Sequence, residues 1–574
     1  MISPMTRYSF ILLKGEEEGF LEKLQELGMM DVTRSSKPVD DHSEELLTKA
    51  EAHMKIIPSA RADVAAVEEK IAAAEKERNS LLVWGQFDSS SIERLKEAGY
   101  SIRYYAVPKK TFLEEWGMIV PLQVIDDSSS KVYFVTVQPS DEDNLLPVDP
   151  IPSPSGSYLL VDKRIEELQA EKAAAEETLA SLEARSDEFE KARKRDLTEL
   201  DLYLAGVSAV PAAENTILTL EGFAPKDKEA EITEYLDTTD AFFIKDDATA
   251  EENPPIRFRN NKFVKMFETL TDMYGRPAYN GFDPTPFISI FFMLFFALCM
   301  GDAGYGLILI IIGLLLKKVD SFKGTAPLVI TLGVATVFVG FFLHTFFSID
   351  IAQWKIFEPI KGIFLPDEIA GYAGGMVLSI VVGIVHLCLA MIMKTITETR
   401  NKGFLESLGT WGWTLLIVGG VVVGGFALTG VLNAKATKLI IIVIGIISAL
   451  GIFLFNNIHR NPLINIGSGL WETYNTVTGL LGDVLSYLRL YALGLAGSML
   501  GLAFNDMGYQ LVSGGNAGIG AWIGFILIVV VGHTLNIAMC ALGAFVHPLR
   551  LNFLEFFKNS GYEAAGRKYN PLSK

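Results

Sequence analysis

Residues 480–502 read LLGDVLSYLRLYALGLAGSMLGL, and this stretch sets one arginine, Arg489, inside an otherwise apolar run that is long enough for a membrane helix. A charged side chain at the centre of a bilayer costs roughly 3 kcal/mol or more, so an arginine at that depth is rare and usually functional. The stretch therefore predicts a transmembrane helix whose arginine takes part in the function of the protein.

Composition divides the chain into two parts of different character. The 574 residues are 50% hydrophobic; residues 266–574 hold 16 acidic and 18 basic side chains, whereas residues 1–265 hold 52 and 32. The acidic first part argues against nucleic acid as a partner, because nucleic-acid binding needs clustered lysine and arginine. We therefore predict a mixed fold, with a cytoplasmic domain over residues 1–265 and an all-α membrane domain over residues 266–574.

The sequence predicts neither a metal site nor a cofactor site. Cys299, Cys388 and Cys540 lie in apolar runs without the spacing of metal ligands, so we assign them to packing. The phosphate-binding pattern G-x-x-x-x-G-K-[ST] does not occur, and GDAGYG at residues 301–306 lies inside an apolar run. We expect a non-catalytic chain without an ATP site.

The first part predicts a coiled-coil rod with two small α/β lobes. Apolar or small residues recur about every 3.5 positions over residues 46–81 and again over residues 161–182, between charged flanks, which is typical of coiled coils. The long interval between the two runs favours an antiparallel hairpin. Strand-like and helix-like pieces alternate at Ser91–Ala98, Ser101–Val107, Lys109–Trp116, Val132–Val137, Thr216–Phe223, Asp227–Tyr235 and Ala241–Lys245. A lone coiled-coil interaction domain is a compatible, simpler interpretation.

Apolar runs begin at Pro284 and predict eight transmembrane helices. The first run, residues 285–316, would be about 48 Å long as one helix, which exceeds a hydrocarbon core of about 30 Å. The Gly-Asp-Ala-Gly at residues 301–304 offers a break. Division there gives spans near 285–300, 304–317, 326–347, 371–394, 410–432, 437–455, 467–506 and 518–557.

The distribution of loop charges supports eight spans rather than seven. With eight spans, most loop lysines and arginines lie on the side of the N-terminal domain, and only Lys355, Lys361, Lys435 and Lys438 lie on the other. Seven spans remove this asymmetry. Because cytoplasmic loops are enriched in lysine and arginine, both termini are expected to be cytoplasmic.

The last two spans each carry one polar stripe. At about 100° per residue, the polar residues of the seventh span lie within about 120° of one another, and those of the eighth span do the same. The first stripe consists of Glu472, Asn475, Asp483, Ser486 and Arg489. The second consists of His533, Asn536, His547 and Arg550. Two such helices can face each other or a water-filled cleft without presenting charge to lipid.

Two further features concern the shape of these helices, and one alternative concerns their charges. Residues 466–505 contain no obvious helix breaker, so about 40 helical residues would span roughly 60 Å and lie steeply tilted. Pro548 is expected to kink the last span. In the alternative interpretation, Asp483 or Glu472 neutralises an arginine in a purely structural ion pair.

Three long stretches resemble the membrane-embedded stator subunit of rotary V-type and A/V-type ATPases, called subunit a in eukaryotes and subunit I in prokaryotes. They are YLRLYALGL at residues 487–495, HPLRLNFLEFFKNSGYEAAGRKYNP from His547, and DPTPFISIFFMLFFALCMGDAGYGLIL from Asp283. The short EGFAP at residues 221–225 is similar to another element of that family, and the order of parts matches over essentially the whole chain. The ALGLAGSML that follows Arg489 looks prokaryotic.

The resemblance implies that Arg489 faces the carboxylates of a rotor ring and that Arg550 is its neighbour on the eighth span. It implies a stator in the plasma membrane of a prokaryote that forms ion half-channels beside a ring of c/K-type proteolipid subunits. The partners would be that ring, peripheral stalk subunits of the E/G type, the catalytic head reached through the stalks, and membrane lipid. By the stripe argument alone, candidate half-channel residues are Glu472, Asn475, Asp483, Ser486, His533, Asn536 and His547.

Two other functional classes are compatible with parts of the sequence. A secondary transporter with a cytoplasmic regulatory coiled coil would use the two stripes as a substrate path, but the two halves of the membrane region show no convincing repeat. A structural membrane tether would explain the coiled-coil arms but not the intramembrane arginines.

Overall fold

The computed structural model describes residues 1–573 except residues 36, 86, 88, 128, 129, 142, 155–157, 213–215, 240, 320, 321, 457–460 and 514–517. It divides into two compact units. One comprises Met1–Glu16, Leu27–Thr33 and Val210–Pro571, and the other comprises Glu17–Glu26, Arg34–Ala209 and Leu572–Lys574.

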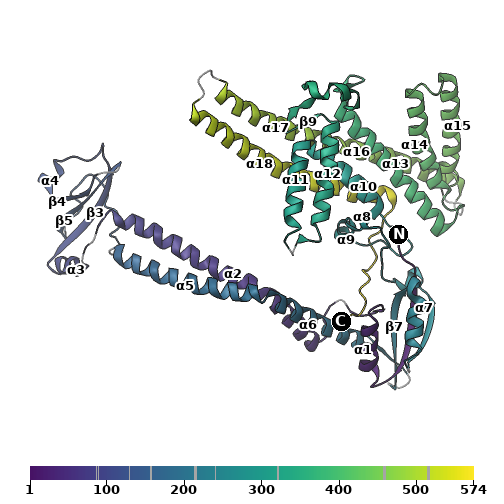
Figure 1. Cartoon of the computed structure of the whole chain (residues 1–574), viewed down its shortest axis with the longest axis horizontal. Coiled ribbons are helices and arrows are strands. Elements are labelled where there is room, and N and C mark those ends of the chain that lie inside the picture. Colours follow the sequence, from purple (N-terminus) through teal and green to yellow (C-terminus); the bar gives the residue numbers. More distant parts are fainter. Residues whose placement is uncertain are drawn as a thin grey trace. The chain divides into compact units, whose positions relative to one another are not determined.

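A long antiparallel helix pair dominates the unit that contains residues 34–209 (Figure 1). Helix α2 (Asp41–Leu82) packs against α5 (Tyr158–Ala184) and α6 (Ser186–Val207), and α2 continues through Pro58. Its start is fixed by a capping box, in which the Asp40 carboxylate accepts from Ser43 N–H at 2.9 Å. The order of the cross-helix ion pairs, Arg78–Asp162, Lys172–Glu68 and Arg61–Glu183, demonstrates the antiparallel alignment.

The apolar residues that recur about every 3.5 positions include side chains that are buried between these helices. Leu46 packs with Leu200 and Leu204, and farther along the pair Ala74 and Leu81 pack with Val161 and Ile165. The short α1 (Glu17–Leu27) lies almost wholly in the same unit.

A small α/β lobe lies between α2 and α5 in the sequence. Its sheet has the order β3-β5-β4, formed by Tyr100–Pro108, Lys131–Pro139 and Leu122–Asp126, and α3 (Ser89–Glu97) precedes it. The prediction of a helix over Lys109–Trp116 is wrong, because only α4 (Trp116–Ile119) is helical there. Trp116 and Phe112 pack on Phe134 of β5, and this tertiary packing prevails over local helix propensity.

The other unit begins with an antiparallel sheet of order β2-β7-β1-β8. Its strands are β1 (Met5–Leu13), β2 (Asp31–Val32), β7 (Ile217–Pro225) and β8 (Phe242–Asp247), and β6 (Val210–Ala212) pairs with β7. Alternate residues of β1 are buried, as expected for a sheet with one covered face. The turn η1 (Lys226–Lys228) and helix α7 (Glu229–Leu236) connect β7 to β8, and α8 (Lys262–Lys265) and α9 (Glu268–Tyr274) follow.

Apolar helices form the rest of this unit. They are α10 (Thr285–Met300), α11 (Ala303–Leu316), α12 (Ala326–Phe342), α13 (Gly374–Lys402), α14 (Leu408–Leu428), α15 (Ala434–Phe453), α16 (Pro462–Ser486), α17 (Leu488–Val512) and α18 (Ile519–Arg550). The expected break after α10 is confirmed, because Gly301 adopts a left-handed conformation (φ 57°) and Asp302 caps α11. In Figure 1, the adjacent helices α17 and α18 run obliquely to α11 and α12.

In the described part of the chain, five helical segments are long and apolar enough to cross a membrane. They are Gly374–Lys402, Leu408–Leu428, Ala434–Phe453, Pro462–Val512 and Ile519–Ser560. Helices α10, α11 and α12 are apolar but shorter, at 16, 14 and 17 residues. The chain is therefore a mostly helical membrane protein with a few small sheets.

The two longest segments depart from regular α-helices. The expected long helix over residues 466–505 is present as part of one helical segment, Pro462–Val512, whose winding changes at Tyr487 between α16 and α17. After α18, residues Leu551–Phe556 form a π-helical turn, η6, which leads into α19 (Phe557–Ser560). Pro548, which lacks an N–H, lies in the last turn of α18 before this change of winding.

Candidate functional site

The seam between α17 and α18 is built from glycines that let the two helices approach closely. A Cβ on Gly497 of α17 would lie 2.5 Å from Cys540 Sγ on α18, and a Cβ on Gly508 would lie 3.1 Å from the Phe525 ring. In the opposite direction, a Cβ on Gly532 of α18 would lie within 3.0 Å of Phe504. Small residues at such contacts are typical of packed membrane helices. The seam therefore brings α17, which carries Arg489, close to α18, which carries the second predicted stripe.

Arg489 lies at this seam and lacks full compensation. Its side chain is half-buried, and its Nη1 atom is buried without a hydrogen-bond partner among the described residues. Arg489 and the exposed Arg550 both act electrostatically on His547, whose Nδ1 is also buried and unpartnered. Arg489 also lies within electrostatic reach of Cys299 on α10. The structure thus concentrates positive charge where α10, α17 and α18 meet.

The acids proposed for a structural ion pair have other partners. Asp483 accepts from Lys558 Nζ at 3.3 Å and from Asn559 Nδ2 at 2.7 Å, both on α19. Glu472 accepts from Asn456 Nδ2 at 2.8 Å, and Asn456 lies three residues beyond the end of α15. This arrangement argues against the interpretation in which either acid neutralises Arg489.

The Tyr487 end of the seam carries one polar network, which we call the acidic network. It contains Asp483, Ser486 and Glu555. Asn559 Nδ2 donates to the Asp483 carboxylate and to the Glu555 backbone carbonyl, both at 2.7 Å, and Ser486 lies within electrostatic reach of the Glu555 carboxyl group. Glu555 lies in the π-helical turn η6, is 4% exposed, and has a buried Oε2 without a hydrogen-bond partner in the described residues. The Phe557 N–H bonds to the Asn552 carbonyl in the i to i−5 pattern of a π-helix, a feature frequent at functional sites.

The Asn505 end carries a second network, which we call the tyrosine network. Tyr305 of α11 is 1% exposed, and its hydroxyl lies 2.7 Å from His533 Nδ1 and accepts from Asn536 Nδ2 at 2.8 Å. His533 Nε2 lies 3.0 Å from Asn505 Oδ1, and Asn536 Nδ2 also donates to the Gly497 carbonyl at 2.8 Å. The network therefore links α11, α17 and α18 inside the protein.

A hairpin between α12 and α13 covers the tyrosine network. It joins β9 (Thr345–Phe346) to β10 (Ile349–Asp350), and its two turn residues, Phe347 and Ser348, have positive φ angles of 47° and 59°. Such a turn normally uses glycine or asparagine, so this one is strained. The buried Asp302 carboxylate accepts the N–H groups of both turn residues, at 2.9 and 2.5 Å, and Asn505 Nδ2 donates to the Phe347 carbonyl.

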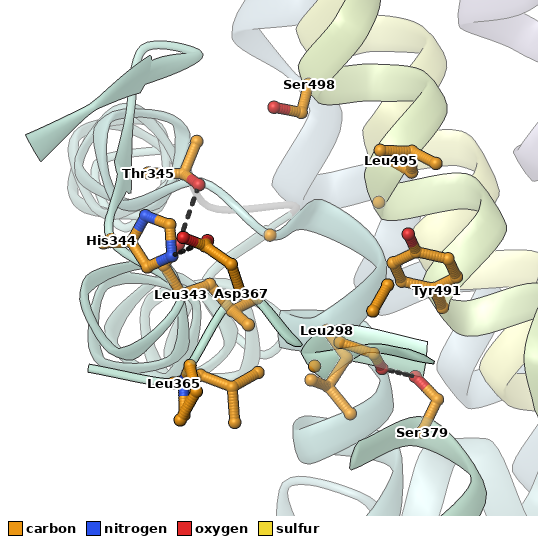
Figure 2. A pocket seen from close by; sticks show the side chains of 16 residues that line it. Leu298, Leu343, His344, Thr345, Leu365, Asp367, Ser379, Tyr491, Leu495 and Ser498 are labelled. Carbon is orange, nitrogen blue, oxygen red and sulfur yellow. Dashed lines mark hydrogen bonds and ion pairs between the residues drawn. The ribbon is translucent and has the colours of Figure 1, made fainter. Parts of the chain in front are cut away.

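A cavity of about 240 Å³ lies on the other flank of α17. Figure 2 shows His344, Thr345 and Asp367 on one wall and Tyr491, Leu495 and Ser498 of α17 on the facing wall. His344 forms ion pairs through Nδ1 with Asp350 at 2.9 Å and through Nε2 with Asp367 at 3.3 Å. Burial opposes ionisation of Asp350, but hydrogen bonds from Ala352, Gln353 and His344 prevail and hold its pKa below the usual value.

The structure brings most of the predicted site residues into two groups on either side of Arg489. Asp483 and Ser486 belong to the acidic network, and His533 and Asn536 belong to the tyrosine network. His547 is subject to the positive charges of both Arg489 and Arg550. Glu472 lies apart because it binds Asn456, and Asn475 is exposed on α16. The two stripes therefore meet only from Asp483 onward.

Sequence reasoning did not include Tyr305, Glu555 or Asp302 among the candidate site residues. A signal for Glu555 was present, since at about 100° per residue it falls roughly 40° from His533 and extends the second stripe. Asp302 precedes Ala-Gly-Tyr at the break in the first apolar run, which is the position of an N-cap. For Tyr305 the sequence carries no signal, because its partners lie more than 200 residues away.

Comparison with known proteins places the chain in a family. A profile of the V-type ATPase 116kDa subunit family matches residues 157–355 and 470–574, more than half of the chain. Among relatives, the A-type ATP synthase subunit I of Methanocaldococcus jannaschii is 31% identical over 434 residues, covering 70% of this chain and 59% of that protein. The V-type ATP synthase subunit I of Borreliella burgdorferi is 26% identical, covering 87% of this chain and 83% of that protein.

These relatives differ in how much of their length the chain spans. The A-type ATP synthase subunit I of Pyrococcus horikoshii is 33% identical over 335 residues, covering 56% of this chain and 48% of that protein. The chain thus spans about half to three fifths of these two archaeal relatives. The profile match includes α16 from Leu470 onward, all of α17, which carries Arg489, and all of α18. The chain belongs to the V-type ATPase 116kDa subunit family, whose relatives here are named as subunit I of A-type and V-type ATP synthases.

Proposed function

We propose that this chain is the stator subunit of the membrane sector of a rotary V/A-type ATPase, and that Arg489 separates two ion half-channels beside the rotor ring. One observation carries the proposal. Arg489 is incompletely paired at the α17–α18 seam, with the acidic network on one side of it and the tyrosine network on the other. Gly497, where the tyrosine network touches α17, lies eight residues from Arg489, or about 12 Å along the helix.

The chemistry of this arrangement suits one-way ion exchange. A cation close to a carboxyl group favours its ionised form, so a ring carboxylate that arrives at Arg489 would release its bound proton or metal cation. A partly buried guanidinium acts in a medium of lower dielectric constant than water, where its field is stronger. The same positive charge repels cations that would pass directly from one network to the other, so exchange requires rotation of the ring.

The two networks supply candidate linings for the two half-channels. Asp483, Ser486 and Glu555 would line the half-channel at the Tyr487 end, and Tyr305, His533 and Asn536 would line the half-channel at the Asn505 end. Arg550 and His547 would set the electrostatic potential beside Arg489. Glu472 and Asn475 are peripheral to both networks and would act at most at the entrance of the first.

In this proposal the membrane domain comprises residues 266–574 with eight spans, formed by α10 to α15, α16 with α17, and α18. The three short helices, 14 to 17 residues long, would measure about 21–26 Å and would require local thinning of the bilayer. Both termini would be cytoplasmic, in a prokaryotic plasma membrane. A C-terminal tag accessible only from outside the cell would rule out eight spans.

Residues 1–265 would form a coiled-coil arm that keeps the stator from rotating with the ring. Its antiparallel helix pair would reach peripheral stalk subunits of the E/G type and, through them, the catalytic head that carries the ATP sites. The arm is acidic, with 52 acidic and 32 basic side chains, which suits basic stalk ends. This chain would therefore couple ion flow to ATP chemistry without catalysing it.

The proposal is tested by Arg489→Gln in the purified complex, reconstituted into vesicles. We expect ATP-driven ion pumping to be abolished. Arg400→Gln, which changes an exposed arginine in the last turn of α13, is the matched control and should pump as the wild type does. Pumping by Arg489→Gln at the normal rate would refute the role assigned to Arg489.

A further inference from the structure

The junction between α16 and α17 is wound differently from the helices on either side. Tyr487 N–H bonds to the Val484 carbonyl and Leu490 N–H bonds to the Tyr487 carbonyl, both at 3.1 Å and both in the i to i−3 pattern of a 3₁₀-helix. Arg489 lies two residues beyond this junction. The direction of its side chain therefore depends on how tightly the chain winds at Tyr487.

The Tyr487 side chain fixes this junction to α13. It is completely buried, and its ring covers Gly383, where any Cβ would overlap the ring. Its hydroxyl lies 3.0 Å from Nδ1 of His386, three residues farther along α13. Position 383 must therefore be glycine for the tyrosine to reach the histidine.

His386 in turn connects the junction to the π-helical turn η6. Its ring is fully buried and stacks between Phe291 of α10, at 4.2 Å between centroids, and Phe556 of η6, at 4.6 Å. Phe556 directly follows Glu555 of the acidic network. One histidine therefore contacts the segment before Arg489 and the segment that carries Glu555.

Packing alone does not explain why residue 386 is a histidine. His386 Nε2 is buried without a hydrogen-bond partner among the described residues, which disfavours the folded state. A phenylalanine would stack equally well between Phe291 and Phe556 and would leave no unpartnered nitrogen. The histidine offers one thing that phenylalanine cannot, which is the bond to the Tyr487 hydroxyl.

We propose that His386 and Tyr487 are positioning residues for Arg489, an inference that rests on the role proposed above for that arginine. Their hydrogen bond holds the 3₁₀ junction against α13 and η6, so that the guanidinium group stays at the α17–α18 seam. When the bond is absent, the start of α17 rotates more freely. The Arg489 guanidinium group then occupies its position at the α17–α18 seam for a smaller fraction of the time. Ions then leak between the networks without ring rotation.

The test uses Tyr487→Phe, His386→Phe and the double variant in the reconstituted complex, with ions transported per ATP hydrolysed as the readout. Each substitution retains an aromatic ring and removes the hydrogen bond. Because the loss of one such bond shifts an equilibrium by roughly two- to tenfold, we expect each single variant to lower the ratio by about that factor. The double variant should be no worse than either single variant.

The matched control is Thr395→Val, which removes a buried 2.6 Å hydrogen bond to Thr414 from the same helix, nine residues beyond His386. It should leave the ratio unchanged. A purely structural role would reduce the amount of assembled complex and leave ions per ATP as they are.

The inference is overturned if both single variants transport wild-type numbers of ions per ATP, if their effects multiply in the double variant, or if neither variant assembles. Arg489→Gln measured in the same vesicles separates this inference from the proposed function. Normal pumping by Arg489→Gln would refute both, whereas a non-pumping Arg489→Gln together with a normal Tyr487→Phe would refute only the positioning role.

Discussion

The contact of Gly497 with Cys540 in the α17–α18 seam gives a prediction that a second substitution can check. Replacement of Gly497 by alanine would place Cβ 2.5 Å from Cys540 Sγ, about 1 Å inside ordinary van der Waals contact. The helices would have to separate by roughly that distance, at a cost of about 1–3 kcal/mol for overpacking. The separation would also stretch the bond from Asn536 Nδ2 to the Gly497 carbonyl, which is 2.8 Å long.

The Gly497→Ala substitution should lower ATP-driven pumping and thermal stability together. We expect Gly497→Ala to lower the melting temperature of the purified complex, with ATP-driven pumping in vesicles reduced in proportion to the disturbance of the tyrosine network. Cys540→Ala removes the sulfur that the new methyl group meets, so the double variant Gly497→Ala/Cys540→Ala should recover most of both losses.

Gly520→Ala is the matched control, because a Cβ on this α18 glycine meets no atom within 4 Å. It should be neutral or slightly stabilising, since alanine favours a helix over glycine by about 1 kcal/mol. A stable, fully active Gly497→Ala, or a double variant as impaired as Gly497→Ala alone, would refute the close packing of this seam.

Two other substitutions test separate parts of the structure. Asp302→Ala removes the acceptor of four backbone N–H groups, those of Gly304, Tyr305, Phe347 and Ser348. It should destabilise the complex by about 1–3 kcal/mol or more in thermal unfolding. An unchanged melting temperature would contradict the observed cap. Because the pKa of Asp350 is lowered in the folded state, its stabilising contribution is present above about pH 4 and lost as pH falls through the folded-state value. The difference in melting temperature between the wild type and Asp350→Asn should therefore shrink on acidification below about pH 4, and a difference independent of pH would refute the assignment.

The sequence alone predicted those features that depend on local pattern. Heptad spacing identified the residues between α2 and its partners, because burial follows helical periodicity. Gly301 and Asp302 marked the break between α10 and α11, because a left-handed glycine and an N-cap aspartate are local requirements of helix ends. The two polar stripes were visible because charge in an apolar helix is conspicuous.

The features that were not predicted depend on contacts distant in sequence or on changes in helical winding. Projection at a constant 100° per residue cannot detect the 3₁₀ junction at Tyr487 or the π-helical turn after Arg550. Position 487 is neither glycine nor proline, so the sequence does not mark the junction. The π-helical turn begins three residues after Pro548, so the proline does not mark its position. The same projection placed Glu472 with Arg489, although its partner is Asn456. Tyr305 joins His533 across more than 200 residues.

The central claim is that the two networks open to opposite sides of the membrane and are separated at Arg489. It is tested most directly by single cysteines in a complex whose three native cysteines are replaced by alanine. Ser486→Cys probes the acidic network and Asn505→Cys probes the tyrosine network, each with a membrane-impermeant thiol reagent applied to one side of sealed vesicles. The account predicts that Ser486→Cys reacts only from the side of the ATPase head and Asn505→Cys only from the other side. Reaction of both cysteines from the same side would contradict it.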